Sequence, residues 1–255
     1  MIDALQNKVV IVTGGAHGLG RAYCLAFARA GSKIIIADLD QVAAAQVAVE
    51  ARAAGGAALA IAVDVSDEHA TKKMAAKALE RFGRIDVLIN NAAMFSVVPM
   101  NRGPIETIDP GEWDRLMAVN LRGLFLCCRA VLPTMRTQKS GKIITIASGT
   151  VFAGAPGRIH YVTSKAATIG FTRTLAREVG GDNITVNCLA PGNTLSEENP
   201  SEEVVRFRES SVRLRALKRI QLPTDAVGAM LFLASPPSDF ITGQTLNVDG
   251  GISFL

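Results

Sequence analysis

The sequence predicts an α/β fold in which a parallel, seven-stranded sheet is wound on both faces by helices. Seven short runs rich in Val, Ile, Leu and Ala alternate with longer, Ala-rich amphipathic segments, an order typical of a parallel sheet. The early runs are continuously apolar rather than alternating, which indicates strands that are buried on both faces. A glycine-rich loop directly follows the first run and opens the first amphipathic segment.

The predicted strands are distributed over the whole chain. We expect them at residues 8–13, 33–38, 58–65, 85–90, 141–148, 183–190 and 245–250. No Pro/Gly/Ser-rich linker, repeat of fixed period or low-complexity segment interrupts this pattern, and 255 residues fit one large domain. We therefore expect a single domain over residues 1–255.

Composition and charge narrow the class of protein. The net charge of +4 is spread along the chain and aromatic residues make up only 5%, so we expect no nucleic-acid partner. No apolar run reaches the roughly 18 residues that span a bilayer, and the start, "MIDALQNKVV", lacks the pattern of a signal peptide. We expect a cytoplasmic protein without a membrane segment or a metal site. In such a compartment thiols stay reduced, and we expect buried thiols at Cys24, Cys127, Cys128 and Cys188.

The glycine-rich loop is "TGGAHGLG", residues 13–20. Glycines at Gly14, Gly18 and Gly20 allow a tight turn and a close approach of the backbone to a phosphate. The helix that follows supplies unpaired N–H groups and a partial positive charge at its start. The spacing GxxxGxG differs from the commoner GxGxxG, but the position between strand and helix favours a dinucleotide site over an ordinary turn.

Two carboxylates follow the next predicted strands. Asp38 ends the second strand, 18 residues after Gly20, where it can accept both ribose hydroxyls of an adenosine and repel the extra phosphate of NADP. Asp64, followed by Val65, ends the third strand and can contact the adenine amino group. The alternative for Asp38 is a cap on the following helix, and the alternative for Asp64 is a cap on the helix that begins near Asp67.

Further motifs, in order and at familiar spacing, resemble those of the short-chain dehydrogenase/reductases. The resemblance runs from Lys8 to Gly251 and implies a single Rossmann-type domain. Its motifs are the loop "TGGAHGLG" (TGxxxGxG), "NNAA" at 90–93 (NNAG), Asn120 in "AVNLRG", Ser148 in "IASGT", Tyr161 and Lys165 in "HYVTSK" (YxxxK), "PGNTLS" at 191–196 (PGxxxT) and "FITGQTLNVDGG". Two positions depart from the family pattern: Ala93 stands for glycine, and Ser196 stands for threonine.

The resemblance implies NAD as the cofactor and assigns a set of residues to it. His17 is included for its place in the glycine loop, although we expect its side chain to face solvent. The expected cofactor-binding residues are Gly14, His17, Gly18, Leu19, Gly20, Asp38, Asp64, Val65, Asn91, Ala92, Tyr161, Lys165, Pro191, Gly192, Thr194 and Ser196.

Hydride transfer between an alcohol and a nicotinamide requires a proton to move as well, and the protein supplies the acid or base. A lysine one helical turn from a tyrosine favours the phenolate, so we expect Lys165 to lower the pKa of Tyr161 from about 10 and Tyr161 to act as the general acid/base. Ser148 arrives from a strand end and would steady the developing alkoxide. By resemblance, Asn120 would hold a water in a proton relay through Lys165. A helix cap or a satisfied polar role remains the alternative for Asn120 and Ser148.

Substrate contacts are expected from three loops beyond the strand ends. The first carries Met94, Phe95, Val97 and Val98, and the second Val151, Phe152 and Arg158. The third, by resemblance, is a mobile lid over about 195–222. Its arginines, Arg206, Arg208, Arg213 and Arg215, either form a solvated face balanced by glutamates or include one that pairs with an acidic substrate group. His160 is expected either to enter the helix without a further role or to line the substrate mouth.

These features together predict an NAD-dependent enzyme that interconverts a secondary alcohol and a ketone. The apolar loops suggest a hydrophobic or aromatic substrate, and the segment 141–176 is similar to the bacterial branch of the family that oxidises 1-arylethanols and pyridoxal-like alcohols. Two alternatives remain. One is a 3-oxoacyl thioester reductase, against which Asp38 argues because such enzymes usually take NADPH. The other is a non-catalytic nucleotide-sensing protein. By resemblance we expect a homotetramer.

Overall fold

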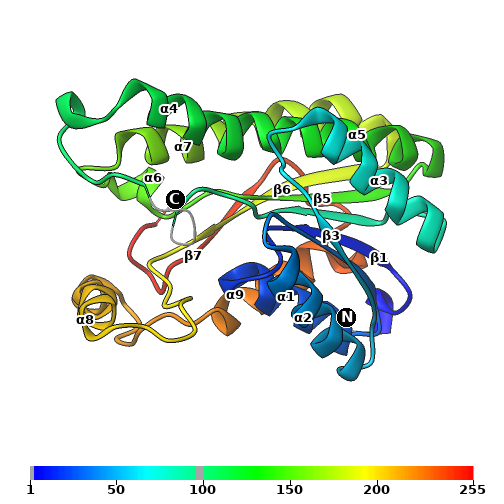
Figure 1. The fold of residues 1–255 in the computed structure, drawn as a ribbon, viewed down its shortest axis with the longest axis horizontal. Helices are drawn as coiled ribbons and strands as arrows, with labels where there is room; N and C mark the ends of the chain where they lie inside the picture. The colour runs from blue at the N-terminus through cyan, green and yellow to red at the C-terminus, as the bar shows by residue number, and fades with distance from the viewer. Residues whose placement is uncertain (1–2, 96–99, 255) are drawn as a thin grey trace.

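The computed structural model describes residues 3–95 and 100–254, and this part of the chain contains a seven-stranded sheet (Figure 1). All neighbouring strands are parallel, in the order β3-β2-β1-β4-β5-β6-β7. The predicted doubly wound α/β fold is therefore confirmed. The strands are β1 (Val9–Thr13), β2 (Lys33–Asp38), β3 (Ala57–Ala62), β4 (Val87–Asn90), β5 (Gly141–Ile146), β6 (Ile184–Pro191) and β7 (Thr245–Val248).

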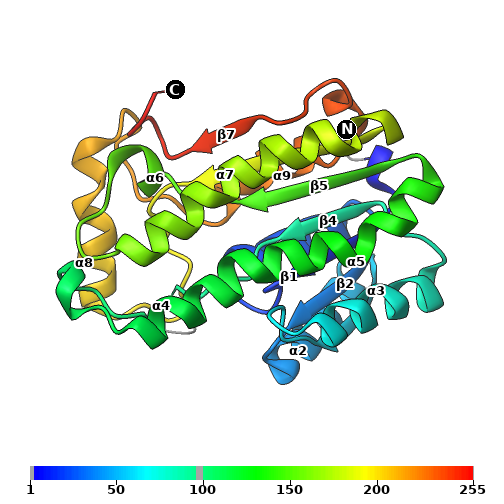
Figure 2. The ribbon, with the colours of Figure 1, turned by 90° about the horizontal axis from the view of Figure 1, so that it is seen from above.

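Helices cover both faces of the sheet (Figures 1 and 2). One layer holds α1 (Gly18–Arg29), α2 (Gln41–Ala53) and α9 (Thr224–Leu233). The opposite layer holds α3 (Glu68–Phe82), α4 (Pro110–Met117), α5 (Gly123–Gln138) and α7 (Ile159–Val179). Two shorter helices, α6 (Thr150–Ala153) and α8 (Glu202–Ser210), lie beyond the carboxyl ends of the strands.

The core consists of two layers, one on each side of the sheet. Val10 and Val12 of β1 pack in the cluster that contains Phe27 of α1, whereas Ile11 between them packs with Met74 of α3. Successive side chains of a strand point to opposite faces, so a strand buried on both sides must be apolar at every position. Burial on both faces of the sheet thus explains the continuous apolar runs of the sequence, as predicted. All four cysteines are free and buried.

Three strands end earlier than the sequence predicted, and β7, which ends at Val248 and not at residue 250, is one of them. β3 stops at Ala62, which pairs with Asp38, the last residue of β2, so the chain has no neighbour with which to continue the ladder. Asp64 and Val65 therefore lie in the loop after β3 and not in the strand. Ser148 likewise lies two residues beyond the end of β5 at Ile146.

The strand order fixes where a ligand can bind. β1 lies between β2 and β4, so the crossovers after β1 and after β3 leave in opposite directions. Open α/β sheets bind ligands at such a switch point, outside the carboxyl ends of the strands. Thr13 and Asn90 are paired at this edge of β1 and β4.

The helical segment Pro110–Gln138, which joins α4 and α5, is long and apolar enough to cross a membrane by length and composition alone. In its most apolar 18-residue stretch, 44% is buried inside the molecule. Cys127, Val131 and Met135 of this segment pack in the core between α5 and the sheet. The core helix of a globular protein meets the same criteria.

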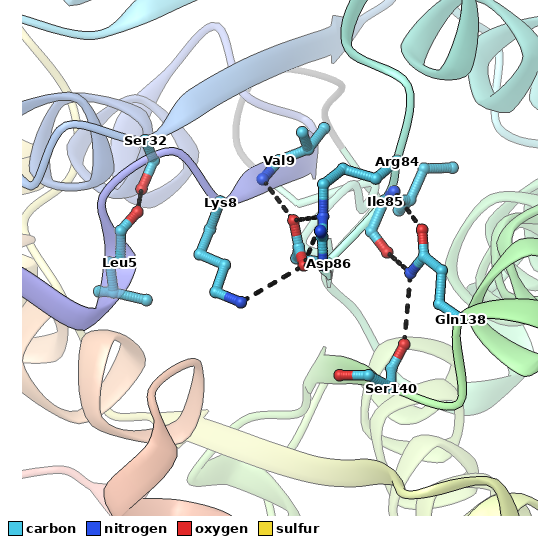
Figure 3. A network of polar contacts seen from close by, with 9 residues as sticks. All are labelled: Leu5, Lys8, Val9, Ser32, Arg84, Ile85, Asp86, Gln138 and Ser140. Atoms are coloured by element: carbon cyan, nitrogen blue, oxygen red, sulfur yellow. Dashed lines mark hydrogen bonds and ion pairs between the residues drawn. The ribbon is translucent and has the colours of Figure 1, made fainter.

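The amino end of the sheet carries a network of polar contacts (Figure 3). The buried carboxylate of Asp86 accepts hydrogen bonds from Val9 N at 2.9 Å and from Arg84 Nη2 at 2.6 Å and Nε at 2.9 Å. The Gln138 amide donates to Ile85 O at 2.7 Å and accepts from Ile85 N at 3.1 Å. These contacts tie β1, the start of β4 and the end of α5 together.

Candidate active site

A cleft of about 980 Å³ lies at the carboxyl ends of the strands. Of the residues predicted for the site, Gly20 and Asn120 lie outside its lining, and both are buried behind it. The others line the cleft together. They are Gly14, His17, Gly18, Leu19, Asp38, Asp64, Val65, Asn91, Ala92, Ser148, Tyr161, Lys165, Pro191, Gly192, Thr194 and Ser196.

The glycine loop forms a cradle that side chains would fill. Gly14 has φ +62°, and a Cβ there would lie 2.8 Å from Ala92 Cα. A Cβ on Gly20 would lie 1.9 Å from Gly14 O. Gly18 has φ +51° and faces Ser196 at the start of the lid. The loop therefore exposes backbone at the start of α1, as a phosphate site requires.

The loop is held in place from β4. Asn91 Nδ2 donates to Gly14 O at 2.8 Å and to Thr13 O at 3.1 Å. Thr13 Oγ1 accepts from Asn91 N at 3.1 Å and from Ala92 N at 3.2 Å. Thr13 was not among the predicted site residues. Its place as the first residue of the glycine motif was the signal that could have found it.

Asp38 is half-buried at the rim of the cleft. Its carboxylate accepts from Ala16 N at 2.9 Å and Asp40 N at 3.0 Å. The cap of α2 is Asp40, which accepts from Ala43 N, so the capping alternative for Asp38 is wrong. His17 Nε2 lies 3.2 Å from Asp40 Oδ2, which places its half-buried ring along the cleft. The Ala43 N–H and His17 hold the pKa of Asp40 below its usual range.

The capping alternative for Asp64 is also wrong. Asp67 caps α3 by accepting from His69 N and Ala70 N. Asp64 Oδ1 instead accepts from Ser66 N at 2.9 Å and Ser66 Oγ at 2.7 Å, which fixes the turn after β3 and leaves the side chain on the cleft.

Tyr161 and Lys165 are adjacent on the buried face of α7. Tyr161 is 6% exposed and Lys165 4%. Lys165 Nζ donates to Ile146 O at 2.8 Å and lies 5.8 Å from the centroid of the Tyr161 ring. Burial lowers the pKa of Lys165 to about 8, because the charged ammonium is removed from water.

Burial raises the pKa of Tyr161 to about 12, while the Ser148 hydroxyl and the charges of Arg158 and Arg208 act in the opposite direction. From the sequence, we expected Lys165 to lower this pKa. In this chain the groups that oppose burial are a hydroxyl and two arginines, and the ammonium of Lys165 is directed to the carbonyl of Ile146. Both arginines lie in the predicted substrate loops, but neither was expected to act on Tyr161.

Ser148 lies where the chain leaves β5 and is 9% exposed. Its Oγ accepts two hydrogen bonds from Thr150, one from Oγ1 at 3.0 Å and one from the backbone N at 3.3 Å. Both contacts use lone pairs of the serine oxygen, so the hydrogen of its hydroxyl remains available to a group in the cleft.

Asn120 lies in a π-helical turn, Ala118–Arg122, between α4 and α5. Its Oδ1 accepts from Met94 N at 2.8 Å and its Nδ2 donates to Ser164 Oγ at 3.1 Å. Ser164 Oγ donates to Tyr161 O at 2.7 Å, so this serine of α7 links Asn120 to the backbone of Tyr161. A cavity of about 10 Å³, the size of a single water, touches Asn120 and Lys165.

The three predicted substrate loops differ in what they bring to the cleft. Met94 and Phe95 line it, and the Phe95 ring centroid lies 5.0 Å from that of Tyr161. Val97 and Val98 lie outside the described residues. In the second loop Arg158 lines the cleft. Val151 and Phe152 do not, because they pack on a core cluster with Ile169, Cys188 and Ala190.

The lid segment is closed at its base. Thr194 pairs with Gln221 in a parallel bridge, and Leu195 N donates to Gln221 O at 2.8 Å. The buried Arg215 donates to Asn193 O, Arg219 O and Asp249 O, so it is a structural clamp.

The other lid arginines have two different environments. Arg206 and Arg213 are exposed, and Arg206 pairs with Glu202 on the surface of α8. Arg208 is buried at the cleft, where it contacts Glu197 and Asn193. The solvated-face interpretation therefore holds for Arg206 and Arg213 and is wrong for Arg208 and Arg215.

His160 lies away from the cleft. Its ring is fully buried, and Nε2 lies 3.2 Å from Glu112 Oε1 of α4. It joins the start of α7 to α4 and does not line the substrate mouth.

Comparisons with known proteins agree with this geometry. The family model described as "short chain dehydrogenase" matches residues 8–203. The chain is 37% identical over 256 residues to a 3-oxoacyl-[acyl-carrier-protein] reductase of Synechocystis sp., covering 98% of this chain and 99% of the relative. It is 36% identical to the (2S)-[(R)-hydroxy(phenyl)methyl]succinyl-CoA dehydrogenase subunit BbsD of Thauera aromatica, covering 98% of each chain.

A solved structure is similar over the same extent. The 3-ketoacyl-(acyl-carrier-protein) reductase from Brucella melitensis, complexed with NADH, superposes with a TM-score of 0.86 at 32% identity, covering 98% of this chain and 100% of that one. Family match, fold and sequence identity over the whole length all agree. The chain belongs to the short-chain dehydrogenase family of oxidoreductases.

Proposed function

We propose that this protein is an NAD(H)-dependent oxidoreductase that interconverts a secondary alcohol and a ketone. The observation that carries the proposal is the convergence of Tyr161, Lys165 and Ser148 on one wall of a cleft whose other end holds Asp38 and the glycine cradle. A hydroxyl acid/base, a buried cation and a second hydroxyl together form a set that can manage the charge on a substrate oxygen.

The cradle and the rim carboxylate fit a dinucleotide. The backbone at Gly14 and Gly18, at the start of α1, would hold the pyrophosphate. The Asp38 carboxylate would accept the adenosine ribose hydroxyls and disfavour a phosphate at that position. The NADH bound to the Brucella melitensis relative supports this choice. The nicotinamide, when bound, supplies the site that gives or takes the hydride.

The proton moves through Tyr161. In ketone reduction its hydroxyl donates the proton to the carbonyl oxygen as the carbonyl carbon receives the hydride, and in alcohol oxidation Tyr161 Oη takes the hydroxyl proton as the carbon loses the hydride. Ser148, whose lone pairs are used by Thr150, directs its own hydrogen to the same substrate oxygen. Lys165 adds positive charge behind Tyr161, and the one-water cavity beside it can carry the proton onward past Asn120.

The substrate is proposed to be hydrophobic or aromatic. Met94, Phe95, Leu214 and Ile252 line the cleft, and Phe95 lies against the Tyr161 ring. The similarity to arylethanol and pyridoxal dehydrogenases remains a prediction. The Synechocystis relative favours a second candidate, reduction of a 3-oxoacyl thioester. The non-catalytic interpretation is disfavoured, because a sensor has no need of Ser148, Tyr161 and Lys165 in one cleft.

A turnover assay separates these candidates. Purified protein is mixed with NADH or NADPH and with acetophenone, 4-phenyl-2-butanone or acetoacetyl-CoA, and the nicotinamide absorbance is followed. We expect a ketone to be reduced with NADH preferred over NADPH. Preference for the thioester would favour the second candidate, and NADH binding without turnover of any substrate would favour the sensor.

The role of Asp38 has its own test. Asp38→Ala should weaken NADH binding by about 10–100-fold, because charge-assisted hydrogen bonds to the ribose are lost. NADPH binding should weaken less or improve. Calorimetric titration of both cofactors measures this, and equal losses for the two would contradict the assignment.

We also propose that the chain forms a homotetramer. Ala166 and Gly170 are exposed along α7, and Phe125 on the neighbouring α5 is 46% exposed. Small residues allow close approach of paired helices. Size-exclusion chromatography with light scattering tests the proposal, and a monomer at micromolar concentration would contradict it.

A further inference from the structure

Three arginines surround one phenylalanine at the mouth of the cleft. The guanidinium carbons of Arg102, Arg158 and Arg208 lie 5.7, 5.3 and 5.6 Å from the centroid of the Phe207 ring. They come from three segments: the loop before α4, the residue before α7, and α8. Arg158, Phe207 and Arg208 line the cleft, so two of the three cations face its interior.

The positive charge of this cluster is only partly balanced. Arg208 pairs with Glu197. Within residues 3–95 and 100–254, neither Arg102 nor Arg158 forms an ion pair or a hydrogen bond through its side chain. Burial and the neighbouring charges of Arg102 and Arg208 lower the pKa of Arg158. Such crowding of like charges destabilises the chain alone and is relieved when an anion binds.

Arg208 has an unused donor at this place. The side chain is 3% exposed, and while its two terminal nitrogens reach Asn193 and Glu197, its Nε has no partner among the described residues. A buried N–H group without an acceptor is unfavourable by about 1–3 kcal/mol, so such groups are rare in native structures. An acceptor atom in the cleft would complete this arginine.

The two cations lie on the substrate side of the cleft. Arg158 precedes Tyr161 by three residues, and both Arg158 and Arg208 act on the Tyr161 hydroxyl through their charge. The expected phosphate site is elsewhere, at the glycine cradle on α1. An anion held by these arginines would therefore lie near the reacting oxygen and apart from the pyrophosphate.

We propose that the substrate carries an anionic group, best satisfied by a carboxylate, which Arg158 and Arg208 bind beside the Phe207 ring. This inference rests on the proposed alcohol/ketone function and names its substrate class: a keto acid and the corresponding hydroxy acid. The planar guanidinium fork matches a carboxylate with two parallel hydrogen bonds, and the ring supplies an apolar wall for the carbon skeleton.

Two other arginines of the lid differ from Arg158 and Arg208 in that solvent or partners within the chain satisfy their side-chain donors. Arg206, on the same helix as Arg208, is exposed and pairs with Glu202. Arg215 is buried, but it donates to three backbone carbonyls and is fully accounted for by the fold. Arg206 is thus a matched control for charge on α8.

The test compares keto acids with their neutral amides. Acetoacetate, levulinate and 4-acetylbenzoate, which place the carboxylate at three distances from the carbonyl, are each assayed with NADH against the corresponding amide. We expect at least one acid to exceed its amide in kcat/KM by about 10–100-fold. Arg158→Gln should remove most of that preference, measured as the ratio of kcat/KM for the acid to kcat/KM for the amide, so that any effect common to both compounds cancels, and it should leave the Kd of NADH unchanged. Arg158→Lys should restore part of it, and Arg206→Gln should change nothing.

Three results would overturn the inference. The first is equal turnover of acid and amide for all three pairs. The second is an Arg158→Gln protein that loses NADH affinity and turns over both compounds less well, which would assign the arginines to the cofactor phosphates. The third is an unchanged preference for the acid in Arg158→Gln. Thermal melting of each variant confirms that it is folded, and Arg158 is chosen first because it is only half-buried.

Failure of the proposed function gives a different pattern. If no ketone of either kind is reduced, the alcohol/ketone assignment is wrong, and calorimetry then tests the anion site alone. Titration of 4-acetylbenzoate into NADH-loaded protein should show binding that Arg158→Gln abolishes and Arg206→Gln preserves. Absence of binding, or binding that Arg158→Gln leaves intact, would overturn the anion site as well.

Discussion

The two ends of the same sheet treat buried polar groups in opposite ways. At the amino end, the Asp86 carboxylate accepts from Val9 N and Arg84, and Lys8 Nζ approaches it to 3.6 Å (Figure 3). At the carboxyl end, Lys165 is buried, and within the described part of the chain its one acceptor is the carbonyl of Ile146.

The difference separates polar groups that hold the fold from those that await a ligand. A fully partnered buried carboxylate links strands and adds to stability. A buried ammonium that burial drives toward neutrality, and an arginine with an unused N–H, lower the stability of the chain alone. Such groups are retained where a cofactor or substrate completes them, which is the common trade between stability and activity.

Apart from substitution of Tyr161, the largest effect on activity is expected for Ser148→Ala. Loss of one hydrogen-bond donor to the substrate oxygen should reduce kcat by about 10²–10³-fold. Ser148 Oγ contacts Thr150 and the Tyr161 hydroxyl at the open cleft, where water can replace the lost contacts, so the free energy of unfolding should change by less than about 1 kcal/mol. Steady-state kinetics and urea denaturation measure the two quantities. An active Ser148→Ala enzyme would remove this hydroxyl from the mechanism.

The next largest effect is expected at the amino end of the sheet, where a substitution should lower stability and leave activity unchanged. Asp86→Ala leaves Val9 N buried without an acceptor and should lower the free energy of unfolding by about 2–4 kcal/mol. Turnover per folded molecule at low temperature should stay within twofold of wild type. Asp239→Asn, which removes the charge of the exposed partner of Lys142, is the control. It should change stability by less than about 1 kcal/mol, because Lys142 Nζ also donates to Ser238 Oγ. Equal losses in both variants would contradict a special role for the amino-end network.

A smaller effect, of opposite sign, is expected for Lys165→Met. The pKa of Lys165 is lowered to about 8, so below that pH the folded chain holds a disfavoured charge. Removing it should stabilise the cofactor-free protein at pH 7 by about 1–3 kcal/mol, although activity is lost. The unfolded lysine stays protonated to about pH 10.5, so wild-type stability gains on the variant as pH rises from about 8.

The measurement is the difference in unfolding free energy between the two proteins at pH 7 and pH 9.5. The difference cancels the opposing titration of the buried cysteines, whose raised pKa values destabilise the fold as pH rises through 9. A variant that is less stable than wild type at pH 7 would show that Lys165 stabilises the chain alone.

The smallest effect is expected for Arg206→Gln. Arg206 and its partner Glu202 both have exposed side chains. The free energy of unfolding should therefore change by less than about 0.5 kcal/mol and kcat/KM by less than twofold. A larger change in kcat/KM would mean that the whole charge of α8, and not Arg208 alone, acts on the cleft.

Much of the fold and of the site could be predicted from the sequence, because both depend on local pattern. Continuous apolar runs located all seven strands, and β2 at Lys33–Asp38 matches its prediction residue for residue. The spacing of Gly14, Gly18 and Gly20 predicted a tight turn in which side chains have no room. In the structure a Cβ added at Gly14 or Gly20 would clash with the neighbouring backbone. The roles assigned to Ser148, Tyr161 and Lys165 stay predictions.

What could not be predicted depends on contacts between distant segments. Nothing local to "SEEVVRFRES" distinguishes Arg208 from Arg206. Arg208 is buried against Asn193 and Glu197 of the segment after β6, whereas Arg206 is exposed. The end of a strand also depends on the length of its neighbour in the sheet. Because β2 ends at Asp38, β3 ends at Ala62, and Asp64 lies in the following loop and not in the strand as predicted. Burial likewise decided the pKa of Tyr161, against a sequence argument that counted only the nearby lysine.

The most direct test of the account is a comparison of wild type and Tyr161→Phe in the presence of NADH and a reducible ketone or keto acid, followed by nicotinamide absorbance. We predict that the wild type oxidises one NADH for each ketone reduced. Tyr161→Phe should bind NADH with unchanged affinity and react about 10²–10⁴-fold more slowly, because the proton donor is gone. A Tyr161→Phe protein that reduces the ketone at the wild-type rate would contradict the assignment of Tyr161 as the acid/base of this site.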